Sequence, residues 1–435
     1  MELIGTVIVY IIMCCAVLGA FAAIKNPDDG LGKQFMEGLH TTGHIFVPAA
    51  GIMASIPFLT IIVEKGVGPI FKAIGADPAI AATTILASDM GGYQLAKALS
   101  ESYEGWVMAM IVGYMAGATI VFSIPMGLAM LDRRDHKYMS LGIMSGILSV
   151  PIGAFISTVF VALFNTNVRE VISTSANPTY AFSISFLQIL INLLPLFIFV
   201  IAIALGLKFF PDFMIKAFMV FGRVMDAFIK IVLVLSIVEI FTGLFSKVFG
   251  GWGFDPIMAD TDDQFRALET AGYIGIMLAG AFPMVYLIRK YFSGALSAVG
   301  KKFGISEVGS AGLLATCANI LAMFSLVRYM PPKDKVINIS FAVCSAFLLG
   351  DHLSFTANFQ PTIILPVILG KFLAGCIAIG LAIWLSVPTA LKLEEKDKAE
   401  GVIKENEYLD QQIPKKEKMP VGEPKPTYAK QQSGV

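Results

Sequence analysis

The stretch GDHLSFTANFQP, residues 350–361, places an acid, an imidazole, two hydroxyls and two amides between two long apolar segments. Apolar sequence precedes it at 336–349 and follows it at 362–387. An ionisable side chain at membrane depth is costly unless it faces a cavity or a partner. A second polar run, SDMGGYQ at residues 88–94, interrupts another apolar segment. We interpret the fold as one that brings these two runs together around a small polar solute.

The composition of the whole chain identifies the class of protein. The chain has 435 residues, of which 56% are hydrophobic and 15% charged, and its mean hydropathy is +0.75. These values predict an all-α polytopic membrane protein, with membrane lipids as partners. The net charge of zero gives no reason to expect nucleic-acid binding. The five cysteines lack C-x-x-C spacing, so neither a disulfide framework nor a metal site is expected, and no cofactor is expected either.

Apolar runs of about 20 residues, the length that crosses a bilayer, predict nine full spans. Their approximate positions are 3–24, 44–63, 106–130, 140–164, 181–207, 217–245, 270–288, 336–358 and 362–388. Two further apolar segments, 77–98 and 308–329, are short and broken by polar or small residues. Each is either re-entrant or a broken helix that crosses, which would give 10 or 11 spans in all.

The distribution of basic residues favours re-entrant hairpins, because Lys and Arg gather on the cytoplasmic side of membrane proteins. With two hairpins, the basic segments 133–137, 289–302 and 328–335 all lie inside, and the acidic loop 255–269 lies outside. This arrangement predicts an outside N-terminus and a cytoplasmic C-terminal tail.

The two broken segments occupy corresponding places in two halves of the chain, as in transporters built from inverted repeats. An offset of 229 residues relates Gly75 to Gly304, just before each segment, although chance similarity between small-residue helices is the alternative. We expect a first repeat at 1–180, a linker helix at 181–212 and a second repeat at 213–390. The remainder, 391–435, is rich in Lys, Glu, Gln and Pro and is expected to be a disordered cytoplasmic tail. Elevator-like movement and a homodimer rest on analogy of architecture.

The candidate binding residues come from the polar interruptions, because unwound backbone inside a membrane offers free polar groups to a ligand. They are Asp89, Tyr93, Gln94, Asn319, Asp351, His352, Phe355, Asn358 and Gln360. Helix capping is the alternative role for Asp89, and packing hydrogen bonds are the alternative for the amides. Glu239, in another apolar run, is either a structural acid or a coupling residue. The chain has no H-E-x-x-H, G-x-S-x-G or P-loop motif, so we do not expect an enzyme and name no catalytic residue.

The strings SDMGGYQLA at 88–96 and GDHLSFTANFQP at 350–361 resemble those of the bacterial ethanolamine-utilization permease family, the EutH type. The similarity covers roughly residues 1–390. It implies a multi-pass protein of the bacterial inner membrane that brings ethanolamine into cells, which degrade it in microcompartments as a carbon and nitrogen source. It does not imply whether transport is facilitated or ion-coupled.

The residues agree with such a substrate, because ethanolamine is a primary amine and is mostly protonated at neutral pH, like a lysine side chain. We expect the carboxylates of Asp89 and Asp351 to bind its ammonium group, and the amides of Asn319, Asn358 and Gln360 to bind its hydroxyl group. Tyr93 and Phe355 are expected to shape the pocket, and His352 to tune the neighbouring acid or pass a proton. The alternatives are an ion-coupled carrier of another small solute, such as a nucleoside or carboxylate, and a gated cation channel.

Overall fold

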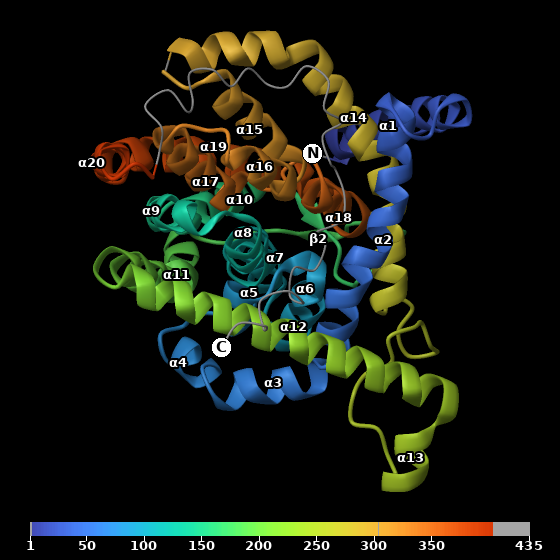
Figure 1. Ribbon diagram of the computed structural model, residues 1–435. Helices are drawn as coiled ribbons and strands as arrows, with labels where there is room; N and C mark the ends of the chain where they lie inside the picture. Colours follow the sequence, from blue (N-terminus) through green and yellow to red (C-terminus); the bar gives the residue numbers. More distant parts are fainter. Residues whose placement is uncertain (1, 303, 403–435) are drawn as a thin grey trace.

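The computed structural model describes residues 2–302 and 304–402, which are almost entirely helical (Figure 1). The first half contains α1 (Glu2–Lys25), α2 (Gly30–Ala54), α3 (Ile56–Lys65), α4 (Gly68–Ala73), α5 (Ala79–Ile85), η1 (Ser88–Met90), α6 (Gly92–Leu99), α7 (Tyr103–Val112), η2 (Gly113–Ser123), α8 (Ile124–Met130), η3 (Arg133–Asp135), α9 (His136–Ile147) and α10 (Val150–Leu163). Two short antiparallel strands, β1 (Asn167–Val168) and β2 (Tyr180–Ala181), follow. The remainder contains α11 (Phe186–Phe209), α12 (Pro211–Thr242), α13 (Leu244–Phe249), α14 (Ala267–Lys302), α15 (Glu307–Ala318), α16 (Ile320–Val327), α17 (Pro332–Ser345), α18 (Asp351–Phe359), η4 (Pro361–Ile363), α19 (Ile364–Leu385) and α20 (Val387–Ala399).

The predicted class, a polytopic helical membrane protein, is confirmed. Six helical stretches in the described part of the chain are long and apolar enough to span a bilayer, and α2 and α3, bent by 57°, would together make a seventh. Three of the nine predicted spans are not single spanning helices in the described part of the chain. The span at 44–63 crosses the bend between α2 and α3, and the span at 336–358 is interrupted between α17 and α18. In the third, the apolar half of α12 carries Asp226, Lys230 and Glu239.

Both segments predicted to be broken are broken helices. The first consists of α5, η1 and α6, with Gly91 at φ 95° between η1 and α6. A residue with a side chain rarely adopts this left-handed conformation, and a Cβ there would lie 2.9 Å from Ile52 and Met53. The second segment consists of α15 and α16, separated by Asn319 in extended conformation.

Several helices start at a spacing near the predicted offset of 229 residues, and the division into two repeats stays a prediction. Five pairs of elements begin within about two residues of that offset, namely α5 with α15, α6 with α16, α7 with α17, α8 with α18, and α9 with α19. The interruption between α17 and α18 corresponds to η2, which is a π-helix. π-helical turns are rare and occur frequently at functional sites. The opposite orientation of the two repeats in a membrane stays a prediction.

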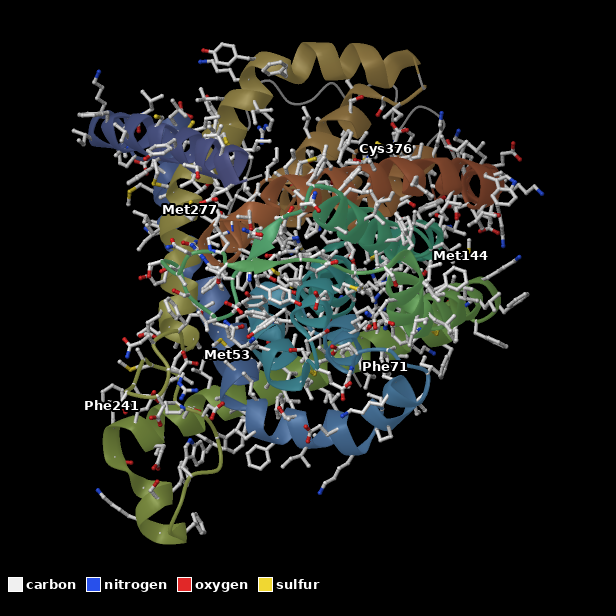
Figure 2. All side chains as sticks on the ribbon, turned by 180° about the vertical axis from the view of Figure 1, so that it is seen from behind. Met53, Phe71, Met144, Phe241, Met277 and Cys376 are labelled. Carbon is white, nitrogen blue, oxygen red and sulfur yellow. The ribbon has the colours of Figure 1, made fainter. Side chains whose placement is uncertain are left out.

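The broken helices lie in the interior, enclosed by longer ones. The helix α17 packs against α9 and α19, while α2 and α14 run side by side along one flank (Figure 1). In Figure 2 the side chains crowd the centre of the bundle, whereas Phe241 lies at its margin on α12, where it is 80% exposed. Apolar side chains that face outward from α1, α11 and α12 suit contact with lipid.

The helix α20 continues past residue 391, where we expected a disordered tail to begin. Its Asp397 side chain is buried and accepts hydrogen bonds from Lys137 Nζ at 2.5 Å and Tyr138 Oη at 2.7 Å. These contacts hold the start of the predicted tail against α9. Residues 403–435 of that tail lie outside the described residues.

Candidate functional site

The two polar runs meet in the interior, where α18 lies against η1. His352 Nε2 is 3.9 Å from Asp89 Oδ1. Asp351, the first residue of α18, directly precedes His352, and α18 packs against η1, which carries Asp89. Asp89 and His352 are buried, and Asp351 is partly exposed. Asp89, Asp351 and His352 therefore form one group, here called the acidic cluster.

The acidic cluster contains buried polar atoms without hydrogen-bond partners among the described residues. They are Asp89 Oδ1, Asp351 Oδ1, both ring nitrogens of His352, and Oγ of the neighbouring Ser354. A buried polar group without a partner costs about 1–3 kcal/mol, and more if it is charged. Such groups are rare in native proteins, so several in one place indicate a site for a polar ligand. This set offers acceptors for an ammonium group and a hydroxyl that can donate or accept.

The backbone between α17 and α18 is tied to the end of α15. Phe347 N donates to Thr316 O at 3.2 Å, and Leu349 N donates to Cys317 O at 2.7 Å. These bonds satisfy carbonyl groups at the end of α15 that helix termination leaves free. A Cβ on Gly350 would lie 2.2 Å from Ala318 O. Only glycine permits this close approach, and it places the start of α18 against the end of α15.

Aromatic rings border the acidic cluster. The centroid of the Tyr114 ring is 4.6 Å from that of His352 and 6.2 Å from that of Phe355. The Tyr114 hydroxyl shares a hydrogen bond of 2.8 Å with Thr356 Oγ1. The imidazole therefore lies against the ring of Tyr114, whose hydroxyl is held by the next turn of α18.

Tyr93 and Gln360 extend this wall toward one end of α18. The Tyr93 ring stacks on Trp106 at a centroid distance of 4.6 Å and meets the edge of Phe355 at 5.4 Å. Gln360 Nε2 donates to Tyr93 Oη at 3.0 Å. The same amide group exchanges hydrogen bonds with the backbone of Arg169, at 2.9 and 3.0 Å. Gln360 thus joins the aromatic wall to the loop that carries Arg169.

The loop at 164–185, here called the closing loop, covers this end of α18 through Arg169. The guanidinium group donates to the carbonyl oxygens of Ser173 at 2.8 Å and Ala176 at 2.5 Å, within the loop. It also donates to Asn358 O at 2.6 Å. A cation at the C-terminal end of a helix is stabilised by the free carbonyl groups there. Arg169 is therefore both the centre of the closing loop and the cap of α18.

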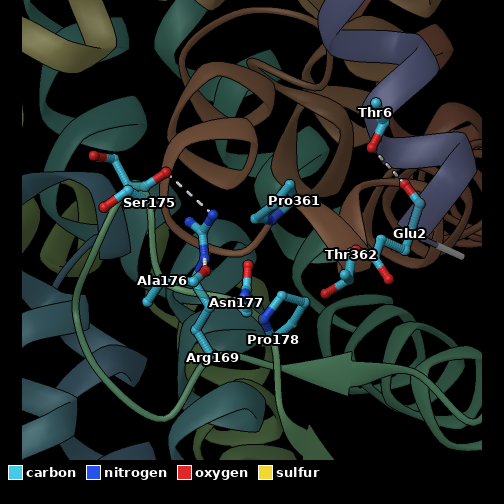
Figure 3. A pocket seen from close by; sticks show the side chains of 10 residues that line it. Glu2, Thr6, Arg169, Ser175, Ala176, Asn177, Pro178, Pro361 and Thr362 are labelled. Carbon is cyan, nitrogen blue, oxygen red and sulfur yellow. Dashed lines mark hydrogen bonds between the residues drawn. The ribbon is translucent and has the colours of Figure 1, made fainter.

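A further contact fixes the closing loop, and a cavity lies beside it. Tyr180 Oη donates to Glu104 Oε1 at 2.6 Å, and this hydrogen bond is the largest cause that raises the pKa of Tyr180 to about 12. The hydroxyl therefore remains a donor at neutral pH. A cavity of about 200 Å³ lies between the loop and the start of α1, lined in part by Glu2, Arg169 and Thr362 (Figure 3). This cavity is separate from the acidic cluster.

Replacing Arg169 by Ala is expected to loosen the closing loop. The change removes several hydrogen bonds from a charged donor, each worth about 1.5–3 kcal/mol, so we expect proteinase K to cut residues 164–185 about tenfold faster. The measurement is the rate of limited proteolysis of the purified full chain. The matched control is Arg223→Ala, because Arg223 is exposed and donates to one carbonyl group of its own helix. Equal cleavage of the loop in both variants would contradict the assigned role.

The other predicted amide residues lie outside the acidic cluster. Asn319 accepts a hydrogen bond from Leu321 N at 2.8 Å and so caps α16, and Asn358 Nδ2 donates to Ser354 O at 2.8 Å. Gln94 Nε2 is 3.4 Å from Thr270 Oγ1, while its Oε1 has no partner among the described residues. The structure thus groups Asp89, Asp351, His352, Phe355 and Tyr93, joins Gln360 to Tyr93, and gives the three other amides separate surroundings.

Glu239 lies near the end of α12 and contacts the start of α13. Its carboxylate accepts hydrogen bonds from Phe245 N at 2.8 Å, from Ser246 N at 3.3 Å and from the Ser246 hydroxyl. These bonds hold the turn between α12 and α13. Of the two roles that the sequence left open, the contacts favour the structural one.

Sequence reasoning missed Lys371, Tyr114 and Arg169. Lys371 was visible as the one charged residue in the apolar run 362–387, and such residues are functional candidates by default. Tyr114 gave no signal among other apolar residues, and Arg169 lies outside the apolar runs. Across 2–302 and 304–402 there is no group of three or more His, Cys, Asp or Glu side chains that could hold a metal ion.

Comparisons with known proteins place these features in a family. The model of the family described as "Ethanolamine utilisation protein, EutH" matches residues 4–385. The chain is 37% identical over 404 residues to the "Probable ethanolamine permease EutH" of Listeria monocytogenes, covering 93% of this chain and 99% of that protein. It is 37% identical over 383 residues to the protein of the same name from Salmonella typhimurium, covering 86% of this chain and 90% of that protein. It is 32% identical over 390 residues to "Uncharacterized protein YxeR" of Bacillus subtilis, covering 89% and 97% of the two chains. No solved structure matches the chain.

Proposed function

Because this chain belongs to the EutH family of ethanolamine utilisation proteins, we propose that it imports ethanolamine across the bacterial cytoplasmic membrane by facilitated diffusion. Two relatives at 37% identity are named probable ethanolamine permeases, which supports a transporter rather than an enzyme. The observation that carries the proposal is the acidic cluster, where two carboxyl oxygens, an imidazole and a serine hydroxyl lie buried without partners among the described residues.

The substrate fits this set of groups in one orientation. The ammonium group of ethanolamine would bind Asp89 and Asp351, whose Oδ1 atoms have no partner among the described residues. Its hydroxyl group would bind His352 or Ser354, which offer both donors and acceptors. The rings of Tyr114 and Phe355 would cover the two methylene groups. Each part of the substrate then meets a group of matching chemistry.

Side-chain contacts close the bundle at both ends of α9 and α10, and we infer from them that access to the acidic cluster alternates between the two sides. At one end the closing loop is tied to α18 through Arg169 and Gln360. At the opposite end of α9 and α10, Lys335 Nζ on α17 lies 2.6 Å from Asp135 Oδ1 of η3. Because basic segments gather near Asp135 and Lys335, we place this end on the cytoplasmic side and the closing loop outside. Import then requires opening of the outer end before the inner one.

Transport by purified full-length protein in liposomes tests the proposal. At neutral pH, with the membrane potential clamped at zero, we expect saturable uptake of labelled ethanolamine that stops at equal concentrations inside and outside. An imposed proton or sodium gradient should not drive accumulation. Carboxylates and nucleosides should not compete, since the site carries two carboxyl groups.

Three results would replace the proposal by another. Accumulation that needs a proton or sodium gradient would indicate an ion-coupled carrier, for which the 3.9 Å approach of His352 to Asp89 offers a proton site. A flux that does not saturate would indicate a cation channel. An absence of uptake, with uptake of a nucleoside or carboxylate instead, would indicate a carrier of a different solute.

A further inference from the structure

Lys371 is a buried cation beside the acidic cluster. It lies on α19, its side chain is fully buried, and its Nζ donates to Tyr114 O at 2.8 Å. The ring of the same Tyr114 lies 4.6 Å from that of His352, between centroids, so the ammonium group lies beside the acidic cluster. Among the described residues, no carboxylate oxygen lies within 4.0 Å of Nζ. The ammonium group of Lys371 is therefore held by a backbone carbonyl and does not form an ion pair by contact.

This placement adds a positive charge without using an acceptor that a substrate needs. Asp89 Oδ1 and Asp351 Oδ1 stay without partners among the described residues. We take both carboxylates and Lys371 as ionised and His352 as neutral when a cation binds, so that these groups sum to one negative charge. Isolated charge in a buried site is costly, so the occupied site is most stable when the ligand makes the sum zero.

Resting on the proposed function, we propose that Lys371 is a specificity-determining residue that restricts the site to cations of a single charge. A protonated monoamine brings the sum to zero. A diamine that carries two charges leaves one positive charge in excess, next to the Lys371 ammonium group. The site therefore accepts an amino alcohol and rejects a diamine of similar length, although both present an ammonium group to the same carboxylates.

Competition in proteoliposomes tests this rule without a variant. Trimethylenediamine, whose two amines are both protonated at neutral pH, should compete with labelled ethanolamine at least about tenfold less well than unlabelled ethanolamine does. Equal competition by the diamine would overturn the proposal.

Substitution of Lys371 gives the reverse expectation. In Lys371→Met the sum becomes two negative charges, so the preference for ethanolamine over the diamine should fall by about tenfold. Lys371→Arg keeps the charge and should retain the wild-type preference. The double variant Lys371→Met with Asp351→Asn returns the sum to one negative charge and should recover the preference, whatever its transport rate. An unchanged preference in Lys371→Met would overturn the proposal, since a purely structural lysine would not set this ratio.

A binding measurement separates this proposal from the proposed function. The melting temperature of the purified full chain in detergent should rise with ethanolamine or ethylamine and rise less with trimethylenediamine, because a ligand stabilises the state it binds. If monoamines stabilise the protein selectively and ethanolamine is not transported, the charge rule stands and the proposed function is wrong. If the diamine stabilises wild type as well as the monoamines do, the charge rule is wrong whatever the transport assay shows.

Discussion

Replacing Asp89 by Asn is expected to lower ethanolamine uptake at subsaturating concentrations by about ten- to a hundredfold, because a buried hydrogen bond to a charged group is worth roughly 1.5–3 kcal/mol. Asp89 is 4% exposed, and its Oδ1 has no partner among the described residues. Water therefore cannot replace the lost contact to an ammonium group. Asn keeps the shape of the side chain, so the break at η1 should persist. The measurement is the initial rate of labelled ethanolamine uptake in proteoliposomes, per amount of inserted protein.

The matched control for this variant is Asp226→Asn on α12. Asp226 is exposed and pairs with Lys230 at 2.7 Å on the same helix. Exposed pairs of this kind contribute about 0.3–0.5 kcal/mol, so uptake should stay within about twofold of wild type. Uptake by Asp89→Asn at the level of Asp226→Asn would remove Asp89 from the binding site.

Replacing Lys335 by Met is expected to destabilise the protein by about 3–5 kcal/mol, because it leaves the carboxylate of Asp135 buried without its cation. The two side chains are 0% and 2% exposed, and Nζ to Oδ1 is 2.6 Å. Met approximates the length of the Lys side chain, so lost packing should be a minor part of the effect. The measurement is the free energy of unfolding in detergent by denaturant titration.

Two further variants make this result specific to a buried ion pair. Lys230→Met breaks an exposed pair, with side chains 61% and 63% exposed, and should cost less than about 1 kcal/mol. The double variant Lys335→Met with Asp135→Asn removes both charges and should recover much of the lost stability. A loss in Lys335→Met no greater than in Lys230→Met would show that the Asp135 carboxylate is not held as a buried charge.

The acidic cluster was predictable in part because ionisable residues stand out against apolar sequence. Asp89, Asp351 and His352 were each found in this way, and the structure brings them together. The sequence predicted an interruption at Gly350, Asp351 and His352, but α17 already ends at Ser345. This earlier end was hidden, because Ala346 to Leu349 are apolar and continue the pattern of a span. Only the close approach of Gly350 to Ala318 O, between distant parts of the chain, shows why the helix ends there.

The partners of the predicted residues could not be derived from the sequence. Lys371 lies 282 positions beyond Asp89, a separation that no local spacing rule covers. Asn319 and Asn358 looked like ligand-binding amides, yet both form hydrogen bonds with backbone groups, Asn319 with Leu321 and Asn358 with Ser354 and Tyr273. An amide has the same appearance in a sequence whether it binds a ligand or caps a helix.

The sequence by itself determined that this protein is a polytopic helical membrane protein of the EutH type, with polar interruptions at 88–94 and 350–361. Polar groups are costly in lipid, so spanning segments are apolar and the polar residues within them can be recognised from the sequence alone. The tertiary structure decided which of these groups remain without partners, which cation lies beside Asp89, and how Arg169 covers the end of α18. These properties depend on distances between segments far apart in the chain, and side-chain packing sets those distances.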